Sequence, residues 1–215
     1  VFCAFIAHPH FFAAKMALSN NPRAVVLGQP DEDDIYEVQR IQTKANVSDL
    51  VEKCLRHNIA DEEFSKAVHA FAEVIEALEV EYQNISGRRY GSFDEDLRHS
   101  GCFKIGWALD VVNQHEEFLD VLSVKLTSSR RPSRENREVQ TAICRALVAM
   151  CLGVNPHIVA ICVNENGIID LLIEIVQKEK PPLRSYATGL LACGLLDRGV
   201  QDRVIKSSNI FDILI

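Results

Sequence analysis

Histidine and cysteine are the residue types in this chain whose spacing could support chemistry. His99 and Cys102 are three residues apart, so one helical turn would bring both to the same metal ion. His157 and Cys162 form a less regular pair. Structural zinc takes four ligands, and no second pair follows at the spacing of a zinc finger. We therefore expect no metal site, and we assign these histidines to helix ends or to solvent.

A nucleophilic cysteine is the other chemistry to consider. Cys102 or Cys151 could act as a nucleophile with a histidine as its base. However, nothing in the sequence brings such a pair together. The seven cysteines are scattered without a Cys-x-x-Cys pair, which is typical of reduced, buried thiols in an intracellular protein. We predict no catalytic residue and no cofactor.

Composition indicates a helical protein with a substantial core. The chain has 215 residues, of which 47% are hydrophobic and 25% charged, with a formal net charge of −7. That acidic balance argues against a nucleic-acid binder, which usually has a basic face. Apolar residues recur every three or four positions and strand-like alternation is rare, so the sequence predicts an all-α fold.

The two ends of the chain point to a fragment. The opening stretch VFCAFIAHPHFFAAKMA is apolar but has no basic region before it and is broken by Pro9, so we do not expect a signal peptide. No stretch approaches the roughly 20 apolar residues of a membrane span. The chain begins with Val1 and ends in FDILI, in the middle of a pattern. We expect a fragment, or an unreliable first segment.

The first half predicts isolated helices. Residues 1–60 are hard to place, with an acidic helix start at 31–34 and helices expected over 35–45 and 48–57. Residues 61–82 predict a strongly amphipathic helix, because their large apolar residues lie on one stripe. The glycine-bearing charged stretch 84–101 predicts a long loop. We place a boundary there, so that 61–101 is a separate segment.

From residue 102 onward the chain repeats itself. The pattern FLDVL at 118–122 returns as IIDLL at 168–172 and as IFDIL at 210–214. A helix expected at 139–153 aligns with another at 183–197. A period of roughly 40–47 residues is typical of armadillo and HEAT arrays, so residues 102–215 predict an armadillo/HEAT-like right-handed α-solenoid segment. The longer first interval is explained by an inserted loop at 127–138.

Two sequences resemble the armadillo-like region of the Vpr-binding protein family, whose members are substrate receptors of cullin-4 ubiquitin ligases. They are PLRSYATGLL at 182–191 and TAICRAL at 141–147, the latter followed by NENGII at 164–169. The resemblance covers about residues 66–215. It implies a non-catalytic scaffold of protein ubiquitination in nucleus and cytoplasm, where ligase-adaptor docking belongs to a β-propeller for which this chain has no matching repeats.

Alternative functions remain open beside the resemblance. A generic armadillo or HEAT adaptor unrelated to ubiquitin would have the same repeats. An enzyme or kinase with its catalytic elements outside this segment is the second alternative, since the chain has no glycine-rich phosphate loop, no His-Arg-Asp and no Asp-Phe-Gly. In each reading the expected partners are other proteins, without nucleic acid or membrane.

Ser133 is a candidate phosphorylation site. The preceding Arg130-Arg131-Pro132 matches the preference of basophilic kinases, and a phosphate would add about −1.5 to −2 charges. A solvated inter-helix loop with chance arginine and serine residues explains the same sequence.

Arg184 and Thr188 are candidate partner contacts, because they lie one turn apart off the apolar face of their helix. The third helix of an armadillo repeat lines the concave binding surface. Arg184 could equally bond carbonyl groups of the adjacent repeat, since its guanidinium carries five donors. Trp107, the single tryptophan, is expected in the core.

The same helix carries two interior glycines, Gly189 and Gly194. Leu183, Ala187, Leu190 and Gly194 share one face, and Ser185, Gly189 and Ala192 lie roughly opposite. Small residues on both sides predict a helix pressed between neighbouring helices, where close packing offsets the weak helix propensity of glycine.

Overall fold

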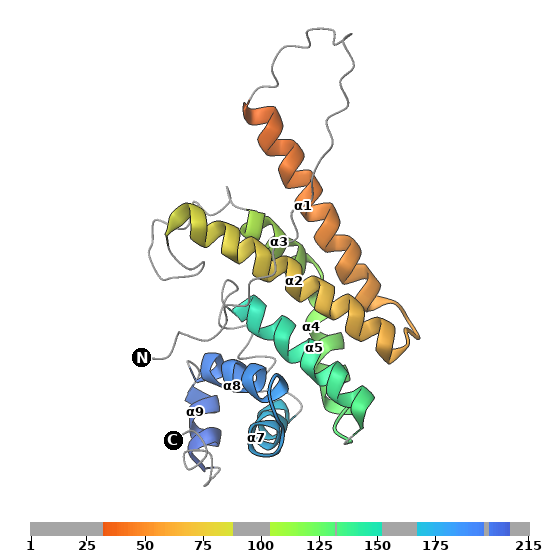
Figure 1. Cartoon of the computed structure of the whole chain (residues 1–215), viewed down its shortest axis with the longest axis vertical. Coiled ribbons are helices and arrows are strands. Elements are labelled where there is room, and N and C mark those ends of the chain that lie inside the picture. The colour runs from red at the N-terminus through yellow and green to blue at the C-terminus, as the bar shows by residue number, and fades with distance from the viewer. Residues whose placement is uncertain (1–31, 88–103, 132, 152–166, 196–197, 207–215) are drawn as a thin grey trace.

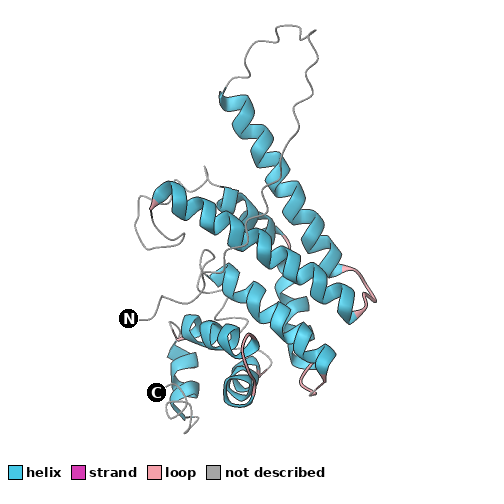
Figure 2. Ribbon diagram, in the orientation of Figure 1, coloured by secondary structure: helices cyan, strands magenta, loops and turns pink. Residues whose placement is uncertain are grey.

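The computed structural model describes residues 32–87, 104–131, 133–151, 167–195 and 198–206, and every regular element within these ranges is an α-helix (Figures 1 and 2). The helices are α1 (Glu32–Leu55), α2 (Asp61–Ser86), α3 (Lys104–Gln114), α4 (Glu116–Ser128), α5 (Arg134–Cys151), α7 (Ile168–Lys178), α8 (Leu183–Gly194) and α9 (Arg198–Lys206). The all-α prediction is confirmed. None of the described helices is both long and apolar enough to cross a membrane.

The first described helix corrects one expectation. We expected two helices, over 35–45 and 48–57, but α1 is continuous from Glu32 to Leu55. Neither proline nor glycine occurs within it, so nothing interrupts the hydrogen-bond pattern of the backbone. Its start falls within the acidic run, as expected. The second half carries its buried residues, Val47, Val51 and Cys54.

The amphipathic helix expected at 61–82 is α2. Phe64, Val68, Phe71, Ile75 and Tyr82 of the predicted stripe are buried. Asp61, Glu62 and Glu63 occupy its first turn, where carboxylates favour the positive end of the helix dipole. The helix ends at Ser86 and is capped by Gly87, whose φ of 70° is the left-handed conformation that glycine adopts at low cost.

The expected inserted loop is mostly helical, which is a second correction. Within 127–138, α4 continues to Ser128 and α5 already begins at Arg134. The reason is local, because Ser133 accepts a hydrogen bond at Oγ from the Asn136 backbone N–H at 3.0 Å. Such a bond satisfies one of the unpaired donors at a helix start, so α5 forms one turn earlier than its apolar pattern indicates.

The expected breaks around α7 are confirmed. Gly167, with a φ of 73°, precedes α7. The helix ends at Lys178, and Pro181 and Pro182 lie in the turn before α8.

The helices α2, α5 and α8 are stacked side by side. In Figure 1, α2, α5 and α8 follow one another down the molecule, and α5 packs against both of the others. The side chain of Val148 on α5 faces Gly189 on α8, and Arg145 lies near Tyr186. From the Arg145–Tyr186 pair to the Val148–Gly189 pair, the residue number rises by three on each helix. The helices α5 and α8 therefore run in the same direction. We call α2, α5 and α8 the helix ladder.

The repeated sequence patterns occupy equivalent places. FLDVL lies in α4 and IIDLL lies in α7, and each of these helices is followed by one member of the ladder. The helices α4 and α7 also contact each other. This arrangement is consistent with a solenoid-like fold. The third pattern, at 210–214, lies outside the described residues, and the right-handed superhelix and the segment boundaries at 60 and 101 remain predictions.

Aromatic contacts join the first helices to the rest. The rings of Phe71 on α2 and Phe118 on α4 meet edge to face, with centroids 5.1 Å apart. Trp107 on α3 is buried, as expected, and its ring meets Tyr36 of α1 at 4.9 Å. The N-terminal half of α1, by contrast, exposes Ile35, Val38 and Ile41.

The packing of α8 corrects a third expectation. Its predicted inner face is buried, including Leu183, Ala187 and Gly194. The opposite face is only partly covered, because Ser185 and Ala192 are exposed. Gly189 has a neighbour in Val148, whose side-chain carbon would lie 3.5 Å from an added Cβ, an ordinary contact distance. The helix is therefore packed closely on its inner face, and on the opposite face Val148 covers it at Gly189.

This geometry separates two substitutions at Gly189. Gly189→Ala should leave the free energy of unfolding unchanged or raise it. The new methyl group fits, and alanine is more favourable than glycine in a helix by roughly 0.5–1 kcal/mol. Gly189→Leu should lower it by about 1 kcal/mol or more, because the larger side chain meets Val148. Urea denaturation of the two variants measures the difference. A leucine variant at least as stable as the wild type would contradict the packing.

Candidate functional site

The densest polar cluster among the described residues is centred on Arg145 of α5. Its Nε and one terminal nitrogen donate to the two carboxylate oxygens of Glu76 on α2, at 2.9 and 2.7 Å. The other terminal nitrogen donates to Glu73 at 3.3 Å. Only 19% of the Arg145 side chain is exposed, whereas its partner Glu76 is 40% exposed, so this two-pronged pair is partly shielded from water. It joins two members of the helix ladder.

His69 and Tyr186 complete the cluster. The Nδ1 atom of His69 lies 3.5 Å from Arg145, and burial together with this cation lowers the pKa of His69, against the opposing effect of Glu73, Glu76 and Glu138. Burial raises the pKa of Tyr186 on α8. The hydrogen bonds to Glu76 raise the pKa of Arg145, which stays charged at every accessible pH. The cluster therefore holds a fixed cation between α2 and α8.

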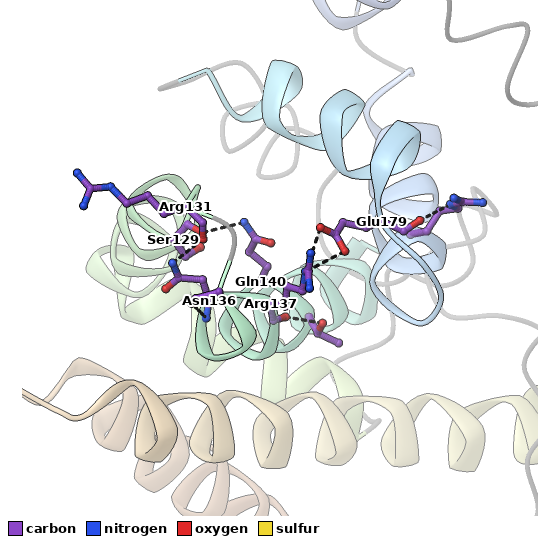
Figure 3. A network of polar contacts seen from close by, with 9 residues as sticks. Ser129, Arg131, Asn136, Arg137, Gln140 and Glu179 are labelled. Carbon is purple, nitrogen blue, oxygen red and sulfur yellow. Dashed lines mark hydrogen bonds and ion pairs between the residues drawn. The ribbon is translucent and has the colours of Figure 1, made fainter.

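A second network connects α5 to the turn between α7 and α8 (Figure 3). The Nε of Arg137 lies 3.1 Å from both carboxylate oxygens of Glu179. The backbone carbonyl of Glu179 in turn accepts a hydrogen bond from Nε of Arg184 at 2.6 Å. One residue at the end of α7 thus binds an arginine from α5 and another from α8.

The turn from α4 to α5 is fixed by two amide side chains. Asn136 donates to the carbonyl oxygen of Arg131 at 2.7 Å, and Gln140 donates to that of Ser129 at 3.0 Å (Figure 3). Gln140 is buried. The backbone around Ser133 is consequently held against α5 rather than extended into solvent.

The predicted contact residues Arg184 and Thr188 lie on the ladder helix α8, one turn apart. Arg184 is exposed and bonds the carbonyl of Glu179, at the end of the preceding helix. Thr188 donates its hydroxyl to the Arg184 carbonyl of its own helix at 2.8 Å. Both bonds are local, and a role in binding a partner stays a prediction.

The candidates for metal and nucleophile chemistry lie mostly outside the described residues. This holds for His99, Cys102, His157 and Cys162, and only Cys151, partly exposed at the end of α5, is described. Burial raises the pKa of Cys54 and of Cys144 to about 12, so these two thiols stay protonated and unreactive near neutral pH. No group of three possible metal ligands occurs within the described ranges.

Comparison with known proteins adds no family. No protein-family model matches this chain, and no solved structure matches it significantly.

Sequence reasoning missed the residues of the Arg145 cluster, although two signals were present. Arg145 is a single cation within the otherwise apolar stretch AICRALVAM, which indicates a buried pairing. His69, Glu73 and Glu76 are spaced four and three residues apart, on one side of α2. Neither signal says which helix provides the partner, because Arg145 and Glu76 are far apart in the chain.

The His69 environment predicts a pH dependence of stability. Its folded-state pKa is lowered, so the native state binds its proton less readily than the unfolded chain does. The contribution of neutral His69 to the free energy of unfolding is complete above the histidine pKa of the unfolded chain, about 6.5. It is lost as the pH falls below that value. The free energy of unfolding of the wild type should therefore fall more between pH 7 and pH 5.5 than that of His69→Gln. Parallel curves for the two proteins would contradict this assignment.

Proposed function

We propose that this chain is a non-catalytic protein-interaction scaffold, part of a substrate receptor of a cullin-4 RING ubiquitin ligase. The observation that carries the scaffold proposal is the helix ladder, in which α2, α5 and α8 stack side by side. Stacked helices of successive units build an extended surface on which a protein partner can lie, and this is how solenoid proteins bind.

The bonds between units support a binding surface that is ordered in advance. Arg145 bonds α2 to α5, and Arg137 bonds α5 to the end of α7. Such bonds hold the relative positions of the ladder helices before any partner arrives. A surface that is already ordered loses less conformational entropy on binding, which favours affinity.

The ligase part of the proposal depends on the resemblance of residues 182–191 and 141–147 to the Vpr-binding protein family. It implies a role in protein ubiquitination in the nucleus and cytoplasm, with the ligase adaptor bound by another part of the protein. It implies neither a cofactor nor a nucleic-acid partner. Within this segment, Arg184 and Thr188 are the proposed partner contacts. They lie together on the part of α8 that follows the Glu179 turn.

The test uses the protein expressed from its own gene with an affinity tag. Thr188→Arg places a long cation on the proposed surface and removes only a hydrogen bond internal to α8. Val124→Arg, at a side chain 59% exposed on α4, is the matched control. Quantitative mass spectrometry of the purified complexes compares both variants with the wild type.

We expect cullin-4 and its adaptor to co-purify in equal amounts with the wild type, Thr188→Arg and Val124→Arg. Thr188→Arg should lose some of the other bound proteins by about five-fold or more, the loss of one central contact, whereas Val124→Arg should keep them. Absence of cullin-4 from the wild-type complex would overturn the ligase proposal and favour a general adaptor. Identical partners for both variants would remove Arg184 and Thr188 from the proposed surface.

A further inference from the structure

Ser133 lies between α4 and α5, close in sequence to the arginines that join this pair of helices to α7 and the turn after it. It precedes α5 directly, and its carbonyl accepts a hydrogen bond from the backbone N–H of Arg137 at 3.1 Å. Arg137 is therefore one helical turn away on the same side of the helix. Ser133 is partly exposed, and the residues before it from Ser129 to Arg131 lie in a turn and not in a helix.

Two arginines beside Ser133 bind acidic residues of the next unit. Arg137 lies with Nε 3.1 Å from both carboxylate oxygens of Glu179, and Arg130 lies with Nε 3.6 Å from Glu174 on α7. Arginines 130 and 131 also stand three and two residues before Ser133 in the sequence, where basophilic kinases read them. Arg130 thus belongs both to the recognition motif and to the ion pairs between units, and Arg137 lies one turn beyond Ser133.

The two neighbouring serines lack the arginines that precede Ser133. Ser129 is buried and donates its hydroxyl to the Leu126 carbonyl at 2.8 Å. Ser128 donates to the Lys125 carbonyl at 3.0 Å, and neither serine has arginines two and three residues before it. A kinase that requires these arginines would select Ser133 among the three.

We propose that Ser133 is phosphorylated by a basophilic kinase, and that the phosphate draws Arg130 and Arg137 away from Glu174 and Glu179 and so loosens the joint between α5 and α7. This regulation is independent of whether the chain serves a ubiquitin ligase. The phosphate is a stronger competitor than a carboxylate, because it brings about −1.5 to −2 charges and three acceptor oxygens to within one helical turn of Arg137.

The modification is an ordinary transfer from ATP. The Ser133 Oγ forms a bond to the γ-phosphorus, the bond from that phosphorus to the bridging oxygen of the β-phosphate breaks, and ADP leaves. The hydroxyl proton passes to the catalytic carboxylate of the kinase. The start of α5 has to open for an extended chain to enter the kinase. That start is held by the Ser133 cap and the exposed Arg134–Glu138 pair, and the turn before it is held by the bonds from Asn136 and Gln140.

The experiment treats the purified chain with ATP and the catalytic subunit of a kinase selective for Arg-Arg-x-Ser. Mass spectrometry maps the modified residues, and a synthetic peptide of residues 127–138 is the positive control. Ser133→Asn is the matched negative control, because asparagine caps a helix about as well as serine but accepts no phosphate. Hydrogen exchange of the α7 amides then compares the modified and unmodified proteins.

We expect phosphate on Ser133 of the folded chain and about two- to five-fold faster exchange in α7, the effect of losing partly exposed ion pairs. Glu179→Gln, which removes the Arg137 pair and leaves the Lys178–Glu174 pair within α7 intact, should give part of this faster exchange without phosphate, and phosphorylation should add less to that variant than to the wild type. A modified peptide with an unmodified folded chain would overturn the proposal. Phosphorylation with unchanged α7 exchange would overturn the loosening of the joint.

Discussion

The bond between Arg145 and the Glu76 carboxylate is the interaction on which the arrangement of the helix ladder most depends. A guanidinium with only 19% of its side chain exposed has to be paired, since an unpaired charge in such a place is costly. The two-pronged geometry fixes both the distance and the rotation of α5 against α2. The helix α8 packs on α5 in turn, so α5 connects the three members of the ladder.

Further ion pairs join neighbouring helices in the same manner. A basic residue of a later helix bonds an acidic residue of an earlier one in Lys104–Glu81, Lys125–Asp61 and Arg145–Glu76. The order is reversed in Lys44–Asp110, Arg130–Glu174 and Arg137–Glu179. Each exposed pair contributes little by itself, so the apolar core remains the main source of stability. The pairs act mainly by selecting one register of the stacked helices.

The sequence was sufficient for the parts of the fold that local patterns determine. The stripe from Phe64 to Tyr82 predicted α2, and the Pro181-Pro182 pair predicted the break before α8. The predictions failed where a single polar side chain changes a boundary, as with the Ser133 cap, which starts α5 inside the expected loop. They failed again where the chain lacks any breaker, as across residues 45–48 of α1. The Arg145 cluster was missed because its partners come from separate helices, and no local pattern encodes that distance.

The most direct test of this account is a double-mutant cycle on Arg145 and Glu76. The free energy of unfolding is measured by urea denaturation for the wild type, Arg145→Ala, Glu76→Ala and the double variant. The account predicts a coupling energy of about 1 kcal/mol or more, because the two side chains form a shielded charged pair. Effects that add to within about 0.3–0.5 kcal/mol would show that the two residues act independently, and would contradict the central place of this bond in the helix ladder.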